Sequence, residues 1–212
     1  MDEKSEQPAR THPGRTGRTP DTSRRSESSR KAILDASMRL VGEVGYNKLT
    51  IEAIAARAGV GKQTIYRWWP SKAAVLLDAF TGVVDEESYQ QGIPDTGDLA
   101  ADLKAVLRAT VDEFNTPSFE APYRALAAAG AADPSLSEQF VRRLMEPGRD
   151  VYVRRFEAAR EAGQMAEDID AAFATELLLG PFQARWLMRT EPLTYEFADT
   201  LVDYVLRGIA PR

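Results

Sequence analysis

The chain lacks the residues on which several protein classes depend. It has no cysteine, so disulfide bridges and thiolate chemistry are excluded. Its single histidine, His12, lies near the N-terminus, and no Ser/His/Asp set, metal cluster or phosphate loop can be assembled elsewhere. No apolar run reaches the length of about 18 residues that a transmembrane helix needs. The first 20 residues have no apolar centre of the kind a secretory signal requires, so we expect a cytoplasmic protein.

The overall composition conceals an asymmetry of charge. With 212 residues, 43% hydrophobic and 28% charged, the chain is typical of a soluble globular protein with one large or two small domains. Its net charge is −5. Residues 1–72 carry 14 basic and 8 acidic side chains, a balance of +6, whereas residues 73–212 carry 13 and 24, a balance of −11. A basic N-terminal module fused to an acidic body would direct only one end toward phosphate.

The first 25 residues are poor in apolar side chains and rich in Arg, Ser, Thr, Gly and Pro. We therefore predict a disordered basic arm over residues 1–25. Within it, residues 14–20 read GRTGRTP and resemble the Arg-Gly arms that enter AT-rich minor grooves. We favour a solvated tail that adds non-specific affinity for phosphate, and a minor-groove arm is the alternative.

Residues 50–72 carry the most informative pattern, TIEAIAARAGVGKQTIYRWWPSK. Thr50 is a good N-cap, and the apolar residues that follow it recur at helical spacing. Gly59 supplies a turn, and a second short helix begins near Gly61. Two short helices around such a turn indicate a helix-turn-helix, whose second helix enters the major groove of DNA.

This segment resembles the DNA-binding domain of the TetR family of transcriptional regulators. The matching motif is Thr-x-x-x-Ile-Ala-x-x-Ala-Gly-Val-x-x-x-Thr-Ile-Tyr-x-x-Trp-Pro-Ser-Lys. Residues 30–45 are similar to the first helix of the family, and residues 177–209 are more weakly similar to its last two helices. The resemblance implies a DNA-binding head, a helical body that forms a homodimer, and an effector pocket in that body.

The side chains expected to contact DNA lie in and around the second helix of the motif. Gln pairs with adenine and Lys with guanine or phosphate, so the exposed first turn is suited to reading base edges. The resemblance implies phosphate contacts for Tyr66 and Lys72, although ordinary packing is the alternative for Tyr66. Trp69 is expected to be a core residue. The predicted DNA-binding residues are Thr50, Lys62, Gln63, Thr64, Tyr66, Arg67, Trp68 and Lys72.

Two positions depart from the family pattern. Gly61 stands where Ser or Thr is common, which removes a hydroxyl, although Gly is tolerated as a cap. Trp68 replaces the more usual His or Tyr, which puts its DNA contact in question. Arg67 is expected to serve instead as a phosphate ligand.

The rest of the chain also predicts helices, and no alternating strand pattern is found. We therefore expect an all-α protein of about nine helices, with a helix-turn-helix domain over residues 26–72 and an effector-binding and dimerisation domain over residues 73–212. Residues 135–138 form a capping box that should open a long helix. Pro147-Gly148 should kink or break that helix before it resumes.

The last two helices are apolar on more than one side, so each should be buried on more than one. A thick core would explain this, and so would a four-helix dimer interface. We favour the dimer, because a recognition helix alone binds weakly, while a two-fold pair reads two major grooves roughly 34–36 Å apart. The predicted interface residues are Phe173, Leu177, Ala184, Leu187, Phe197, Leu201, Tyr204 and Val205.

The effector pocket is implied by the resemblance alone. Glu176 and Gln183 are the preferred candidates, because polar groups buried in apolar helices need a partner. The predicted pocket residues are Phe114, Phe119, Tyr123, Tyr152, Glu176, Gln183 and Trp186, with Arg124 and Phe156 as further candidates.

We therefore predict a sequence-specific, DNA-binding transcriptional regulator and not an enzyme. It would be a homodimeric repressor that binds a palindromic operator in double-stranded DNA and is released by a small-molecule effector, with no cofactor. The first alternative is an architectural DNA-binding protein without an effector. The second is a helical enzyme that uses the body as its site.

Overall fold

The computed structural model describes residues 22–82 and 91–211, and every regular element in these ranges is helical. This confirms the all-α prediction. Nine helices are present in the described ranges if α8 and α9, which a π segment joins, are counted as one. The helices are α1 (Thr22–Val44), α2 (Ile51–Ala58), α3 (Lys62–Tyr66), α4 (Lys72–Thr81), α6 (Leu99–Phe114), α7 (Pro117–Gly130), α8 (Pro134–Phe140), α9 (Glu146–Glu161), α10 (Ala171–Met188) and α11 (Tyr195–Ile209).

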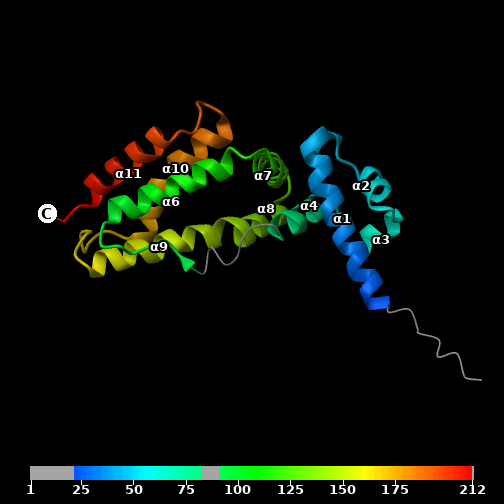
Figure 1. The fold of residues 1–212 in the computed structure, drawn as a ribbon, viewed down its shortest axis with the longest axis horizontal. Coiled ribbons are helices and arrows are strands. Elements are labelled where there is room, and N and C mark those ends of the chain that lie inside the picture. The colour runs from blue at the N-terminus through cyan, green and yellow to red at the C-terminus, as the bar shows by residue number, and fades with distance from the viewer. Residues whose placement is uncertain (1–21, 83–90, 212) are drawn as a thin grey trace, which may run out of the picture.

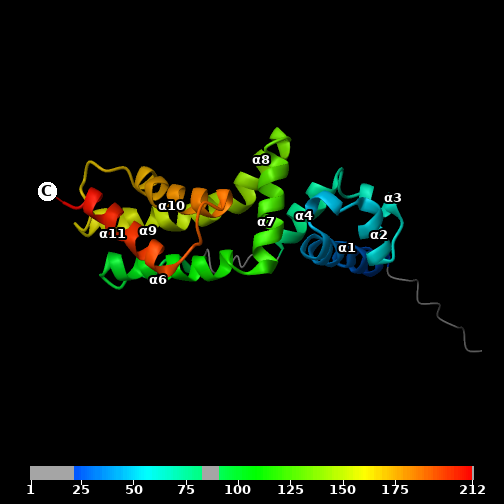
Figure 2. The same cartoon turned by 90° about the horizontal axis from the view of Figure 1, so that it is seen from above.

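The helices form an elongated molecule with a head at one end and a body at the other (Figure 1). The head consists of α1, α2 and α3, and the body of α6, α9, α10 and α11. Between them lie α4, α7 and α8, as both views show (Figure 2). The arrangement makes the middle helices the route by which any movement of the body reaches the head.

Two hydrophobic cores correspond to the two ends of the molecule. The first joins the head and α4 to buried residues of α7 and α8, including Leu126 and Phe140. The second lies among the helices of the body. Phe119 and Tyr123 of α7 pack against both cores. The head core therefore extends beyond the helix-turn-helix itself into the middle of the chain.

The ends of the head helices are set by local hydrogen bonds. After α1, Gly45 adopts a φ of 75° and a ψ of 164°, an extended conformation with positive φ that suits glycine and cannot continue the helix. The Thr50 hydroxyl accepts a bond from Ala53 N at 3.1 Å, and Ser71 accepts one from Ala74 N at 3.2 Å. The predicted N-cap at Thr50 is confirmed, and Ser71 caps α4 in the same way. The helix α1 begins at Thr22, so residues 22–25, which we expected to belong to the disordered arm, are helical; residues 1–21 lie outside the described residues.

The long middle helix differs from the prediction at two places. The prediction of a capping box over residues 135–138 is wrong, because Asp133 caps α8 by accepting hydrogen bonds from the backbone N–H groups of Ser135 and Leu136. The chain also stays helical through Pro147, and the irregularity is a π segment just before it, Val141–Met145. Pro147 has no N–H with which to bond the carbonyl four residues back, so the turn that precedes it widens.

A buried ion pair holds the far end of the body together. Arg155 of α9 donates to Asp102 of α6 at 2.9 Å, and both side chains are almost completely buried. Asp102 also accepts bonds from the backbone and hydroxyl of Thr96, and Arg155 donates to the carbonyl of Pro94. The loop before α6 is thereby fixed to two helices. Among residues 22–82 and 91–211, no helix combines the length and apolar character needed to cross a membrane.

Candidate nucleic-acid interface

The helix-turn-helix is built around a short, rigid turn. Gly59 closes α2 in the left-handed conformation with a φ of 68°, and Val60 N donates back to Ala55 O at 3.0 Å. This is a helix end that favours glycine because a side chain there would be strained. Ile65 of α3 and Ile54 of α2 are fully buried in the same core. The turn and these two residues fix the angle at which α3 leaves α2.

The opposite face of α3 is open to solvent. Lys62 and Gln63 are exposed, Thr64 is half-buried, and the side chain of Tyr66 is 54% exposed. Arg67, the residue that ends the helix, is exposed as well. The structure therefore brings the predicted base-reading and phosphate-binding side chains onto one short surface. Their contacts with DNA remain predictions.

Lys62 is paired with an acidic residue of the preceding helix. Its Nζ lies 3.0 Å from Glu52 Oε1, and both side chains are mainly exposed. The hydrogen bond and the opposite charge raise the pKa of Lys62, and the same bond lowers the pKa of Glu52. If Lys62 contacts DNA as predicted, a phosphate or a base would compete with Glu52 for its ammonium group. Sequence reasoning missed this pair, since ten residues separate its members.

The aromatic residues after α3 have different environments. Trp69 is only 5% exposed, which confirms it as a core residue, and its Nε1 donates to Asp78 Oδ2 at 3.1 Å. Trp68 is half-buried and meets Trp69 edge to face at 5.4 Å. The guanidinium of Arg67 lies 4.8 Å from the Trp68 ring centroid. A cation over an aromatic face is attracted by it, so Trp68 restrains the Arg67 guanidinium at the end of α3.

Lys72 has more internal partners than the prediction supposes. Its Nζ donates to the carbonyls of Tyr46 at 2.9 Å and Leu49 at 2.8 Å, and lies 4.3 Å from the Tyr46 ring centroid. Two of the three N–H groups therefore hold the turn between α1 and α2. The third is the one that a phosphate would use. The phosphate role of Lys72 remains a prediction beside this structural one.

Four of the predicted effector-pocket residues meet in one aromatic cluster. Phe114 lies 4.8 Å from Phe119 and 4.7 Å from Trp186, and Phe119 stacks on Tyr123 at 5.4 Å, all between ring centroids. Phe80 of α4 joins the cluster 5.1 Å from Phe119. Its members come from five helices; they are Phe80, Phe114, Phe119, Tyr123, Phe140, Phe182 and Trp186.

The remaining pocket candidates lie elsewhere. Glu176 is exposed and pairs with Arg149 at 2.9 Å, so the expectation that it is a buried polar group is wrong. The reason is that Glu176 lies on a side of α10 that is open to solvent, where it meets Arg149 of α9. Gln183 is half-buried, and Tyr152 and Phe156 are buried in the core of the body.

The predicted interface residues fall into two groups. Ala184 of α10 is exposed, and the larger apolar side chains exposed with it are Phe173 at 58%, Leu177 at 45%, Leu187 at 44% and Tyr204 at 65%. On α11, Phe197 and Leu201 are half-buried and pack against the core of the body. Val205 is 8% exposed and belongs to that core, so its assignment to the interface is wrong. It lies on the face of α11 that packs inward.

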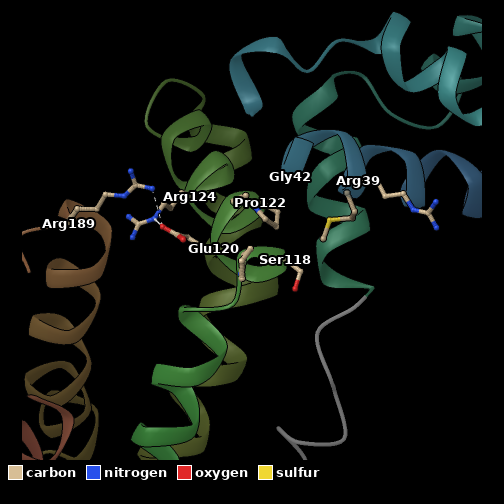
Figure 3. A pocket seen from close by; sticks show the side chains of 10 residues that line it. Arg39, Gly42, Ser118, Glu120, Pro122, Arg124 and Arg189 are labelled. Carbon is tan, nitrogen blue, oxygen red and sulfur yellow. Dashed lines mark hydrogen bonds and ion pairs between the residues drawn. The ribbon is translucent and has the colours of Figure 1, made fainter. Parts of the chain in front are cut away.

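A groove of about 450 Å³ lies where α1 meets α7 (Figure 3). Glu120, Arg124 and Arg189 point toward one another along one side, whereas Arg39 points away. Glu120 accepts bonds from Arg124 at 2.9 Å and Arg189 at 3.1 Å, and Arg124 also donates to Leu187 O. Of the predicted residues only Arg124 lies here. The groove is lined by Met38, Arg39, Gly42, Pro117, Ser118, Glu120, Ala121, Pro122, Arg124 and Arg189.

Within the residues that the structure describes, no three His, Cys, Asp or Glu side chains gather in a way that would hold a metal ion. His12 lies outside the described residues.

Comparison with known proteins covers both ends of the molecule. Residues 33–79 match the family described as "Bacterial regulatory proteins, tetR family", and residues 93–205 match "Tetracyclin repressor-like, C-terminal domain". An uncharacterised HTH-type transcriptional regulator of Bacillus subtilis, YdeS, is 32% identical over 87% of this chain and 91% of its own length.

Two further proteins match over similar lengths. The DNA-binding transcriptional repressor TetR of Mycobacteroides abscessus is 28% identical over 86% of this chain and 94% of its own. The crystal structure of the TetR family regulator SCO0332 superimposes with a TM-score of 0.66 and 34% identity, over 87% of this chain and all of the other.

Proposed function

Because the chain belongs to the TetR family, whose members are not enzymes but dimeric, DNA-binding transcriptional regulators, we propose that it is a repressor released from its operator by a small-molecule effector. The observation that carries the DNA-binding part is the exposed face of α3. It presents a lysine, an amide and a hydroxyl in one helical turn, on a helix whose other face is fixed in the core.

In this proposal the readout of bases is assigned to Lys62, Gln63 and Thr64. Gln63 is suited to a bidentate bond with adenine, and Lys62 to guanine acceptors. Their position at the start of α3 is the position from which helix-turn-helix proteins reach base edges.

Backbone binding is assigned to the residues around the readout helix. Tyr66 and Arg67 are exposed beyond the first turn of α3, Lys72 retains one N–H, and Thr50 lies at the start of α2. Such contacts fix the register of the protein on the duplex but carry no sequence information. Trp68 acts through Arg67, whose guanidinium it holds against its ring.

A second copy of the chain is expected on the exposed faces of α10 and α11. Phe173, Leu177, Leu187 and Tyr204 leave an apolar surface in solvent that a two-fold partner would cover. The symmetric dimer would then present two α3 helices to successive major grooves of a palindromic operator, roughly 34–36 Å apart.

The effector is expected at the aromatic cluster. An apolar or aromatic molecule that enters between α6, α7 and α10 would separate rings that now touch, among them Phe119 and Phe80. Phe80 belongs to α4, so the displacement would move the helix that follows the helix-turn-helix. The effector would favour a conformation of the body in which the two α3 helices no longer match the groove spacing, which is a shift of population.

Selection of bound sequences from a random DNA pool at physiological salt tests the proposal first. An enriched inverted repeat supports sequence-specific dimeric binding and gives the spacing of the half-sites. Salt-sensitive binding to any duplex without enrichment would contradict the proposal and favour an architectural protein.

The effector is tested separately by heating the protein with panels of small molecules. A compound that binds only the folded state raises the melting temperature. The same compound must release the selected operator. Compounds that raise the melting temperature but leave operator binding unchanged would contradict release by that effector.

A further inference from the structure

One carboxylate between the head and the body, that of Asp78 on α4, receives donors from three separate parts of the chain. Arg30 of α1 donates to Oδ2 at 2.5 Å, and Trp69, from the turn after α3, donates to the same oxygen at 3.1 Å. Arg143 of the π segment donates to Oδ1 at 2.7 Å. We call these four residues the Asp78 cluster. Two of its donors belong to the head and one to the segment that leads into α9.

The cluster is closed by further contacts. Arg143 also donates to the hydroxyl of Thr81 at 2.8 Å, so it binds α4 at two points one helical turn apart. The guanidinium of Arg30 lies 5.8 Å from the Trp69 ring centroid. The Asp78 side chain is only 18% exposed, whereas Arg30 and Arg143 reach it from more exposed positions. The carboxylate is thus mostly shielded from water and surrounded by hydrogen-bond donors.

The charges favour an ionised Asp78. Burial is the largest single influence and acts against the charged form, but hydrogen bonds from Arg143 and Trp69 and the charges of both arginines outweigh it and lower the pKa of Asp78. Asp78 therefore remains an acceptor at neutral pH. Bonds of an ionised acceptor to arginine are among the stronger ones in proteins.

Arg143 reaches this site from within the π segment. A π turn adds a residue to the helical repeat and so rotates the side chains that follow it relative to those before it. Arg142, the neighbour of Arg143, is 63% exposed and lies 4.0 Å from Glu138, four residues earlier in α8. Adjacent arginines in one segment thus have separate partners, and only one of them crosses to α4.

Trp69 connects the cluster to the recognition helix. Its backbone N–H donates to Ile65 O at 3.0 Å, and Ile65 is the residue that anchors α3 in the core. A shift of the Trp69 ring therefore shifts the end of α3. The chain of contacts runs from the π segment through Arg143 and Asp78 to Trp69 and α3.

We propose that Asp78 and Arg143 are positioning residues for DNA binding, which hold α3 at a fixed orientation to the body. The proposal rests on the proposed function for its consequence at the operator, but the orientation is a property of the protein alone. When Arg143 is replaced, the head keeps its core, which it shares with α7 and α8, but loses the polar bonds that narrow the range of its angle to the body. Neither residue contacts DNA.

A distance measurement tests the orientation without DNA. The chain has no cysteine, so spin labels attached to Ala56→Cys on α2 and Glu157→Cys on α9 report one head-to-body distance. Both positions are exposed. Labelled protein is mixed with an excess of unlabelled protein so that labels in two subunits do not interfere, and the distance distribution is measured by pulsed electron resonance.

We expect Arg143→Gln to broaden or displace the distribution and Arg142→Gln, the matched control, to leave it unchanged. Arg143→Lys keeps a charged donor and should restore part of the narrow distribution. Circular dichroism must show the same helix content in all variants, and if Arg143→Gln unfolds, Asp78→Asn replaces it. Identical distributions for Arg143→Gln and Arg142→Gln would overturn the proposal.

The operator obtained by selection gives the functional readout. We expect Arg143→Gln to bind it about 5- to 20-fold more weakly and to tolerate two inserted base pairs between the half-sites better than the wild type does. A uniform loss of affinity without a change in spacing preference would contradict a positioning role. If the wild type enriches no sequence, the proposed function fails, while the label distances still decide whether the Asp78 cluster orients the head.

Discussion

The contacts that build the helix-turn-helix of the head join residues that are close in sequence, whereas those that build the body join residues that are far apart in sequence. In the head, the Thr50 cap and the Gly59 turn lie within a few residues of the groups they bind, and the readout residues are consecutive. In the body, Asp102 and Arg155 are separated by 53 positions, and Phe114 and Trp186 by 72. A site formed by neighbouring residues can be predicted from the sequence, whereas a site formed by distant helices can be recognised only once the packing of those helices is known.

The same contrast appears in what each region leaves exposed. The head exposes polar side chains on α3, which suits a charged and hydrated partner. The body exposes Phe173, Leu177 and Tyr204, which suit an apolar partner such as a second copy of the chain. Each end of the molecule therefore indicates the chemistry of what it would bind. The predictions that follow test this division, in order of decreasing effect.

The largest effect on operator affinity is expected from disruption of the dimer interface that we propose for the body. Leu177→Glu would place a charge in the proposed dimer interface, and monomers lose the gain from binding two half-sites at once, about 10²–10⁴-fold in affinity. Analytical ultracentrifugation and operator titration measure both consequences. Ala162→Glu adds the same charge just beyond α9 and serves as the control. A Leu177→Glu protein that remains dimeric would remove this face from the interface.

Stability should depend more on the distant pair of the body than on a local cap of the head. Arg155→Met leaves Asp102 buried without its cation, and we expect a loss of about 3–5 kcal/mol in the free energy of unfolding. Thr50→Ala should cost about 1 kcal/mol. Arg108→Met, which removes an exposed pair with Asp199, should cost less than either, because solvent screens exposed ion pairs. Urea titrations at pH 7 measure all three, and equal losses would contradict the distinction.

The readout of the head should be separable from stability. Lys62→Ala and Thr64→Ala should each weaken operator binding by about 1–3 kcal/mol if they contact bases, with an unchanged melting temperature. Glu52→Gln is the informative companion, because it frees Lys62 without removing it. Fluorescence anisotropy on the selected operator gives the affinities. Unchanged affinity in both alanine variants would exclude these residues from the readout.

Acid should affect the body through Asp102. Burial opposes its charge, but bonds from Thr96 and Arg155 outweigh this and lower the pKa of Asp102. Because its folded pKa is below the unfolded value of about 3.9, its contribution is complete above about pH 5 and is lost as the pH falls through 4 toward the folded pKa. Urea midpoints between pH 7 and pH 3 should therefore fall more for the wild type than for Asp102→Asn. Parallel curves would contradict the assignment.

The smallest effect is expected from the N-terminal arm. Removal of residues 1–21 leaves α1 whole, and it should lower the slope of log affinity against log salt by about 0.9 for each phosphate that the arm would otherwise neutralise. Sequence preference should be unchanged, because a solvated tail reads no bases. Operator titrations at several salt concentrations measure the slope. A weaker preference for the selected operator would instead favour an arm in the minor groove.

Several predictions from sequence were wrong for reasons that packing explains. Ser135 is a plausible cap, but Asp133 lies at the true start of α8 and takes that role. Glu176 is exposed and Val205 is buried, because helical periodicity gives the apolar sides of α10 and α11 but not which side meets the rest of the body. The bonds of Lys72 to two carbonyls of a turn more than 20 residues away contradict no prediction, but no local pattern indicates them.

By itself, the sequence determined the all-α class, the helix-turn-helix, its Thr50 cap and the exposed residues of α3 that we propose for readout. These follow from hydrogen bonds and periodicity within one or two helical turns, where the order of residues fixes the geometry. Only the tertiary structure decided the Asp78 cluster, the aromatic cluster, the Lys62–Glu52 pair and the buried Arg155–Asp102 pair. Each of these depends on the angle and register at which separate helices meet, and those are set by the packing of whole side-chain surfaces.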